Sequence, residues 1–119
     1  YATLDEALDQ ADAISFHCPP AGGPILDADR IARLKPGVVV VNTARAELID
    51  DAAMLAALDS GQVSTLATDV FHREPPEMTP LLRHDRVILT PHAGGLTEES
   101  VDRATRVAVE NLLKVLEHR

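Results

Sequence analysis

The stretch Val38-Val39-Val40-Val41 decides the fold class of this chain. A continuous β-branched run is typical of a strand that is buried on both faces, as strands of parallel sheets are. Pro36-Gly37 ends the helical pattern in front of the run, which carries Ile31 and Leu34 and for which Asp27 is the expected N-cap. A helix followed directly by a buried strand indicates an α/β protein.

Helical and strand patterns alternate along the rest of the chain. Thr3 and Glu6 form a capping-box pattern at the first helix, Asp50 or Asp51 is placed to begin a later helix, and Gly61 is placed to end it. The expected strands are residues 13–17, 38–41, 66–71 and 87–90. This order, with short loops, predicts a parallel sheet with helices on both faces and right-handed crossovers.

Beyond Thr97, apolar residues recur at every third or fourth position, which is the spacing of one helix face. They are Val101, Ala104, Ala108, Leu112 and Val115. The pattern predicts a helix of about 20 residues. We therefore expect residues 1–96 to form one unit and residues 97–119 to form a long C-terminal helix.

Composition limits the classes of partner. The 119 residues are 45% hydrophobic and 25% charged, as in a single globular domain, and the net charge of −8 argues against nucleic acid and anionic membrane as partners. No apolar run approaches the roughly 20 residues of a membrane span. The single Cys18 fits a reducing cytoplasm. Because the chain starts at Tyr1 and not at Met, we expect it to be a piece of a longer protein.

Polar residues follow each expected strand. In order along the chain these are His17-Cys18, Thr43-Ala44-Arg45, Asp69 and Pro91-His92. Ligands of open α/β sheets bind beyond the carboxyl ends of the strands, so one sheet edge should collect an Arg, an Asp and two His residues. Each also has a plain structural explanation: Arg45 could pair with Glu47 or Asp50, and Asp69 could cap a turn. The combination of an Arg, an Asp and two His residues at one sheet edge indicates a ligand site more specifically than any of these residues does alone.

These residue types favour hydride transfer coupled to proton transfer. The planar fork of Arg45 suits the carboxylate of a 2-keto acid, and His92 suits proton exchange with its carbonyl oxygen near neutral pH. Glu74, in the preceding loop, could reach His92 and favour the protonated ring. Gly94 and Gly95 would let a flat ligand lie close to the backbone. No His or Cys spacing indicates a metal site, and none is expected.

The segments 41–45, 68–75 and 90–95 together resemble the D-isomer-specific 2-hydroxyacid dehydrogenases. The resemblance implies the second half of a Rossmann-type NAD-binding domain, followed by the helix that leads toward a substrate domain. It implies that Arg45 binds the substrate carboxylate, that His92 is the acid/base, and that Glu74 is its partner. It also implies that Asp69 contacts the nicotinamide end of NAD. Arg45 and His92 would touch the cofactor too, with the remaining contacts made around His17, Cys18, Pro19, Thr43, Ala44 and Gly94.

The sequence departs from the family at several points. Ala46-Glu47 follow Arg45 where glycine is usual, and Glu47 places a negative charge that could disfavour a phosphorylated substrate. A Gln in place of Glu74 would resemble formate dehydrogenase, so the Glu argues against that activity. The chain has no G-x-G-x-x-G and no acidic ribose ligand beyond it, so NAD is the expected cofactor and NADP is not excluded.

Two further expectations concern the function of the longer protein and the self-association of this chain. The function implied is an NAD(P)-dependent dehydrogenase of D-2-hydroxy acids, and the alternative is a dinucleotide-sensing, corepressor-like binding protein of the same fold. Strand 13–17 should pair with residues 38–42 on one side and remain open on the other, because the first half of the sheet is not in this sequence. An open edge favours pairing with a second copy, so we expect a homodimer.

Overall fold

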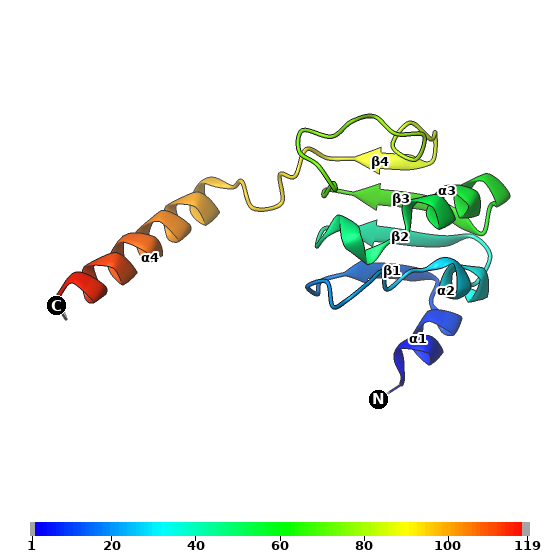
Figure 1. The fold of residues 1–119 in the computed structure, drawn as a ribbon, viewed down its shortest axis with the longest axis horizontal. Coiled ribbons are helices and arrows are strands. Elements are labelled where there is room, and N and C mark those ends of the chain that lie inside the picture. Colours follow the sequence, from blue (N-terminus) through cyan, green and yellow to red (C-terminus); the bar gives the residue numbers. More distant parts are fainter. Residues whose placement is uncertain (1, 118–119) are drawn as a thin grey trace.

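Four parallel strands form one sheet in the order β1-β2-β3-β4 in the computed structural model, which describes residues 2–117 (Figure 1). The strands are β1 (Ala13–Phe16), β2 (Val38–Asn42), β3 (Val63–Thr68) and β4 (Val87–Leu89). The helices are α1 (Leu4–Gln10), α2 (Ala28–Arg33), the 3-10 helix η1 (Ala46–Leu48), α3 (Asp51–Ser60) and α4 (Glu98–Glu117). Every strand pair is parallel, which confirms the predicted α/β class.

Local hydrogen bonds set the ends of the helices where the sequence predicted them. Thr3 and Glu6 form both halves of a capping box at α1. Asp27 accepts a hydrogen bond from Arg30 N at 2.9 Å, and Asp50 accepts one from Ala53 N at 2.9 Å. Asp50, and not Asp51, is therefore the N-cap of α3. Gly61 ends α3 with a φ of 81°, in the left-handed region where a residue without Cβ is favoured.

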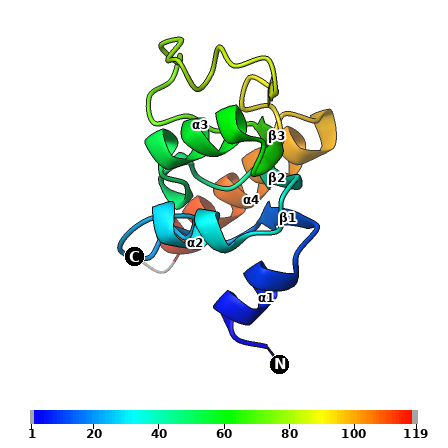
Figure 2. The same cartoon turned by 90° about the vertical axis from the view of Figure 1, so that its right-hand side faces the viewer.

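The core lies on one face of the sheet. This corrects the prediction of helices on both faces and the prediction that the strand with Val38–Val41 is buried on both faces. Helices α2 and α3 lie on the same side of the strands (Figures 1 and 2), and within residues 2–117 no helix covers the other side. Val38 and Val40 are buried beneath these helices, whereas Val39 and Val41 are only half-buried. On the uncovered side, Ile88 is 59% exposed. Right-handed crossovers that advance in one direction place their helices on one face, and this chain winds in one direction only.

Strand β3 begins and ends three residues earlier than the predicted segment 66–71. Val63 pairs with Val38, so the ladder starts there and ends at Thr68. The Thr68 hydroxyl donates to Val70 O at 3.0 Å and accepts from Val70 N at 3.3 Å, which turns the chain out of the sheet. Asp69 therefore stands just beyond the strand end. The following segment has no regular helix or strand, and Leu81 anchors it in the core.

Helix α4 extends away from the sheet, as Figure 1 shows in orange and red. Thr97 begins it as predicted, because its side chain accepts a hydrogen bond from Ser100 N at 3.1 Å. None of its described residues is buried. Its exposed apolar residues include Val101, Val107, Leu112 and Val115. Within residues 2–117, no helix has the length and apolar character needed to cross a membrane.

Candidate functional site

The sheet register brings the polar segments to one edge. Phe16, Asn42, Thr68 and Leu89 lie in one row across the four strands. The residues that follow them therefore emerge side by side, and two backbone bonds continue the alignment. Asp69 N donates to Asn42 O at 3.0 Å, and Thr90 N donates to Thr68 O at 3.1 Å.

The loops that follow β1 and β2 line one cavity at this edge. Its volume is about 370 Å³, and its walls are His17, Cys18, Pro19, Thr43, Ala44 and Arg45. His17 Nε2 is hydrogen-bonded to Ser15 Oγ at 2.8 Å, which holds the ring against its own strand. All six wall residues belong to the set that the family resemblance implies for cofactor contact.

Asn42 fixes the turn that presents Arg45. The buried Asn42 side chain donates to Arg45 O at 2.8 Å and accepts from Ala44 N at 3.1 Å. Arg45 itself is exposed, and its Nη1 donates to Ala44 O at 2.6 Å. Among residues 2–117, no ion pair joins Arg45 to Glu47 or Asp50, so that plain explanation of Arg45 does not hold. Sequence reasoning missed the role of Asn42, although an Asn at a strand end is a common turn former.

His92 and Glu74 meet across 18 positions of sequence. His92 Nδ1 lies 2.6 Å from Glu74 Oε1, and both side chains are partly exposed, at 44% and 42%. Because a carboxylate only accepts hydrogen bonds, Nδ1 carries the proton in this pair. A cavity of about 350 Å³ lies beside them, with largely apolar walls that include Phe71, Pro75 and Leu89. The structure therefore brings the proposed acid/base and its proposed partner together.

Asp69 lies beneath the loop that carries His92. Its carboxylate accepts hydrogen bonds from Thr90 Oγ1 at 2.5 Å and from Ala93 N and Gly94 N at 2.9 Å each. The donated bonds from Thr90 and then Ala93 lower the pKa of Asp69, while burial opposes them and Gly94 N and the His92 charge reinforce them. Asp69 thus caps a turn, which is the plain structural explanation that the sequence also allowed. Sequence reasoning gave Thr90 no role beyond the end of a strand. Nothing in the apolar residues before it indicates that its hydroxyl would bind Asp69.

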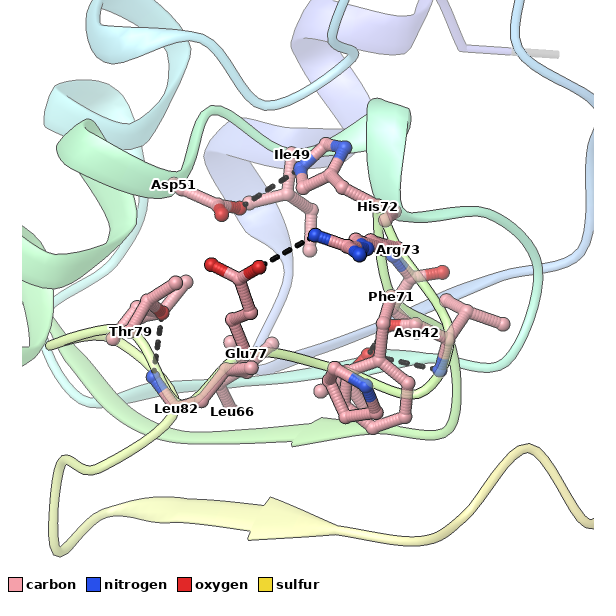
Figure 3. Close-up of a pocket in the computed structure, with 15 residues that line it drawn as sticks. Asn42, Ile49, Asp51, Leu66, Phe71, His72, Arg73, Glu77, Thr79 and Leu82 are labelled. Carbon is pink, nitrogen blue, oxygen red and sulfur yellow. Dashed lines mark hydrogen bonds and ion pairs between the residues drawn. The ribbon is translucent and has the colours of Figure 1, made fainter.

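A separate apolar cavity of about 290 Å³ lies between the sheet and the segment after β3 (Figure 3). Two pairs lie across its rim: His72 Nε2 is 3.4 Å from Asp51 Oδ1, and Arg73 Nη1 is 2.6 Å from Glu77 Oε1. Its walls contain none of the residues predicted for catalysis or cofactor binding. Among residues 2–117, no group of three or more His, Cys, Asp and Glu side chains is arranged to hold a metal ion.

Comparison with known proteins identifies relatives. The chain is 40% identical over 112 residues to D-3-phosphoglycerate dehydrogenase of Mycobacterium tuberculosis, covering 92% of this chain and 21% of that protein. Its structure superposes on a glyoxylate reductase from Paecilomyes thermophila with a TM-score of 0.90 and 36% identity, over 98% of this chain and 36% of that one.

A D-lactate dehydrogenase from Aquifex aeolicus, solved with NAD and lactic acid, gives a TM-score of 0.87 at 29% identity, over 99% of this chain and 41% of that one. The chain thus spans about a fifth to two fifths of these relatives. Residues 1–94 match the model of the D-isomer specific 2-hydroxyacid dehydrogenase NAD binding domain. The chain therefore belongs to the NAD-binding domain family of the D-isomer specific 2-hydroxyacid dehydrogenases.

Proposed function

We propose that this chain is the catalytic half of the NAD-binding domain of a cytoplasmic enzyme that interconverts D-2-hydroxy acids and 2-keto acids. The observation that carries the proposal is the 2.6 Å contact between His92 Nδ1 and Glu74 Oε1, beside a strand end at the edge that also bears Arg45. In this proposal residues 1–96 form the half domain, and residues 97–119 lead toward a substrate domain.

The residues present suit a nicotinamide cofactor. The cavity bounded by the loops after β1 and β2 has small or compact walls, among them Cys18, Pro19 and Ala44, which leave room for a flat ring. When bound, NAD supplies or accepts the hydride, and the protein supplies orientation and protons.

The protein groups divide the remaining work. Arg45 binds the carboxylate of the 2-keto acid through its planar fork and thereby orients the carbonyl. Since Glu74 occupies His92 Nδ1, His92 Nε2 is the nitrogen that exchanges a proton with the substrate oxygen. During reduction, Nε2 gives its proton to the carbonyl oxygen as the carbonyl carbon receives the hydride. During oxidation, it takes the hydroxyl proton, and the Glu74 carboxylate stabilises the resulting imidazolium.

Replacement of Arg45 by Lys tests the proposal in the intact protein. Arg45→Lys keeps the charge and loses the fork, so kcat/KM for glyoxylate or hydroxypyruvate with NADH should fall by the equivalent of about 2–3 kcal/mol. Arg33→Lys is the matched control, because Arg33 pairs with Asp9 on the surface of α2 and should leave kcat/KM unchanged.

The outcomes separate the two candidate functions. An unchanged kcat/KM in Arg45→Lys would remove Arg45 from the substrate site. Binding of NADH by the unsubstituted protein without turnover of any 2-keto acid would favour the dinucleotide-sensing binding protein instead.

A further inference from the structure

His92 occupies a backbone conformation that needs support. Its φ is 52°, in the left-handed region that residues with a Cβ rarely adopt. Upstream, His92 N donates to Thr90 O at 3.0 Å. Because rotation about φ moves the whole side chain, this backbone conformation is the one that places the imidazole against Glu74 in the structure. Whatever holds the loop in this conformation therefore holds the His92–Glu74 pair.

The downstream support comes from one carboxylate. Asp69 Oδ1 accepts from Ala93 N, and Asp69 Oδ2 accepts from Gly94 N, at 2.9 Å each. These are the two amides that directly follow His92. Two successive N–H groups can point at the same carboxylate only while the backbone around them is turned, so the pair of bonds fixes the turn.

The carboxylate is itself anchored from the sheet. Asp69 follows β3, and its Oδ1 also accepts from the hydroxyl of Thr90, which follows β4. Only 6% of Asp69 is exposed. The fit is close, because a Cβ on Gly94 would lie 3.1 Å from Asp69 Oδ2, whereas a Cβ on Gly95 would meet no atom within 4 Å.

We propose that Asp69 is a positioning residue that holds His92 in its left-handed conformation through the N–H groups of Ala93 and Gly94. This role differs from the nicotinamide contact that the family resemblance implies. The two are compatible, since a carboxylate accepts about four hydrogen bonds and three are used within the described chain. The catalytic consequence rests on the proposed function, while the structural role does not.

Asp69→Asn tests the inference. An amide keeps one acceptor oxygen and turns an NH2 group toward the second N–H, so one of the two amide bonds must break. In the 119-residue chain, hydrogen exchange followed by NMR should show that the Ala93 and Gly94 amides lose protection. In the intact enzyme, displacement of His92 by about 1 Å should lower kcat about a hundredfold, with little change in KM for NADH.

Thr90 gives a second pair of variants in case Asp69→Asn fails to fold. Thr90→Val keeps the β-branched shape and removes the hydroxyl that anchors Asp69, so kcat should fall. Thr90→Ser keeps the hydroxyl and should restore kcat. Equal kcat values in the two Thr90 variants would overturn the proposal that an Asp69 carboxylate anchored by Thr90 positions His92.

The kcat and KM values distinguish positioning from cofactor binding. A raised KM for NADH with unchanged kcat, or protected Ala93 and Gly94 amides in Asp69→Asn, would overturn the proposal and leave Asp69 as a cofactor ligand only. Absence of turnover in the unsubstituted enzyme would defeat the proposed function instead. In that case, loss of amide protection in Asp69→Asn would still support the positioning role.

Discussion

His92 lies between two carboxylates that contact it in different ways. Glu74 contacts the ring at Nδ1, and Asp69 contacts the backbone amides that follow the ring. The contact with Glu74 affects the protonation of the imidazole. The contact with Asp69 affects the position of the imidazole. Substitutions of these two carboxylates should therefore have separable effects on the pH profile and on stability.

Glu74→Gln should shift the pH profile of ketone reduction. A neutral amide still orients the ring but no longer favours the imidazolium, and reduction needs protonated His92. The alkaline limb of kcat/KM for reduction should therefore move to lower pH. Glu77→Gln is the matched control, because Glu77 pairs with Arg73 in the same loop and not with His92. A limb that stays in place would show that Glu74 does not govern the protonation of His92.

Asp69 should contribute acid-sensitive stability. Hydrogen bonds from Thr90, Ala93 and Gly94 lower its pKa in the folded state, so the folded chain favours the charged form more than the unfolded chain does. That contribution is complete above the unfolded pKa, near 4, and is lost as the pH falls through the folded pKa. Urea unfolding of the unsubstituted chain and of Asp69→Asn should give a stability difference at pH 7 that shrinks below about pH 4.

Asp85→Asn provides the control for this comparison. Asp85 is exposed in the turn before β4, and its substitution should leave stability at pH 7 nearly unchanged. If the stability difference for Asp69→Asn is the same at pH 7 and below pH 4, the Asp69 carboxylate is not held in its charged form by these bonds.

At the scale of elements, the helix ends are set locally and the sheet is set by pairing. The length of α3 shows the first case, with the Asp50 side chain at its start and left-handed Gly61 at its end. Strand β3 shows the second, since its start at Val63 is set by the register with Val38. Substitutions at a helix end should therefore act within that turn.

Gly61→Ala should destabilise the chain by about 1 kcal/mol, because a Cβ is disfavoured at a φ of 81°. Space is not the reason, since the nearest atom to an added Cβ is Arg86 Nη1 at 3.8 Å. Gly61→Asn is the matched variant, because Asn tolerates the left-handed region and should cost less. Chemical denaturation measures both, and equal losses would mean that backbone conformation is not the cause.

At the scale of the whole molecule, the surfaces that lack partners within residues 2–117 include the free edge of β1 and helix α4. Strand β1 pairs with β2 alone and forms the sheet edge, and no described residue of α4 is buried. An unpaired edge strand is a template for pairing with another chain. These surfaces support the homodimer that the sequence analysis proposed, with the same patch on each copy.

Self-association of the 119-residue chain should depend on the β1 edge. Ser15→Lys places a charge at an exposed position of this edge strand and should shift the chain toward the monomer. Ala56→Lys adds the same charge on the exposed surface of α3 and should leave the association unchanged. Light scattering across a dilution series measures both. A monomer at high concentration, or equal effects of the two variants, would exclude pairing through β1.

The sequence by itself determined the local structure and the family. The caps at Thr3, Asp27 and Gly61 were predictable because each depends on hydrogen bonds or backbone conformation within about one helical turn. The parallel sheet followed from alternating helices and strands, and the strand ends identified which polar residues share an edge. Motif resemblance then led to the family that the match of residues 1–94 shows.

Only the tertiary structure decided which sheet face is covered and which groups touch. The prediction of helices on both faces was wrong, because the winding direction of the crossovers determines the covered face and a run of valines does not reveal it. Asp69 reaches amides 24 and 25 positions away, and Glu74 reaches a ring 18 positions away. Such contacts depend on strand register and loop path, which arise from packing of the whole chain and not from neighbouring residues.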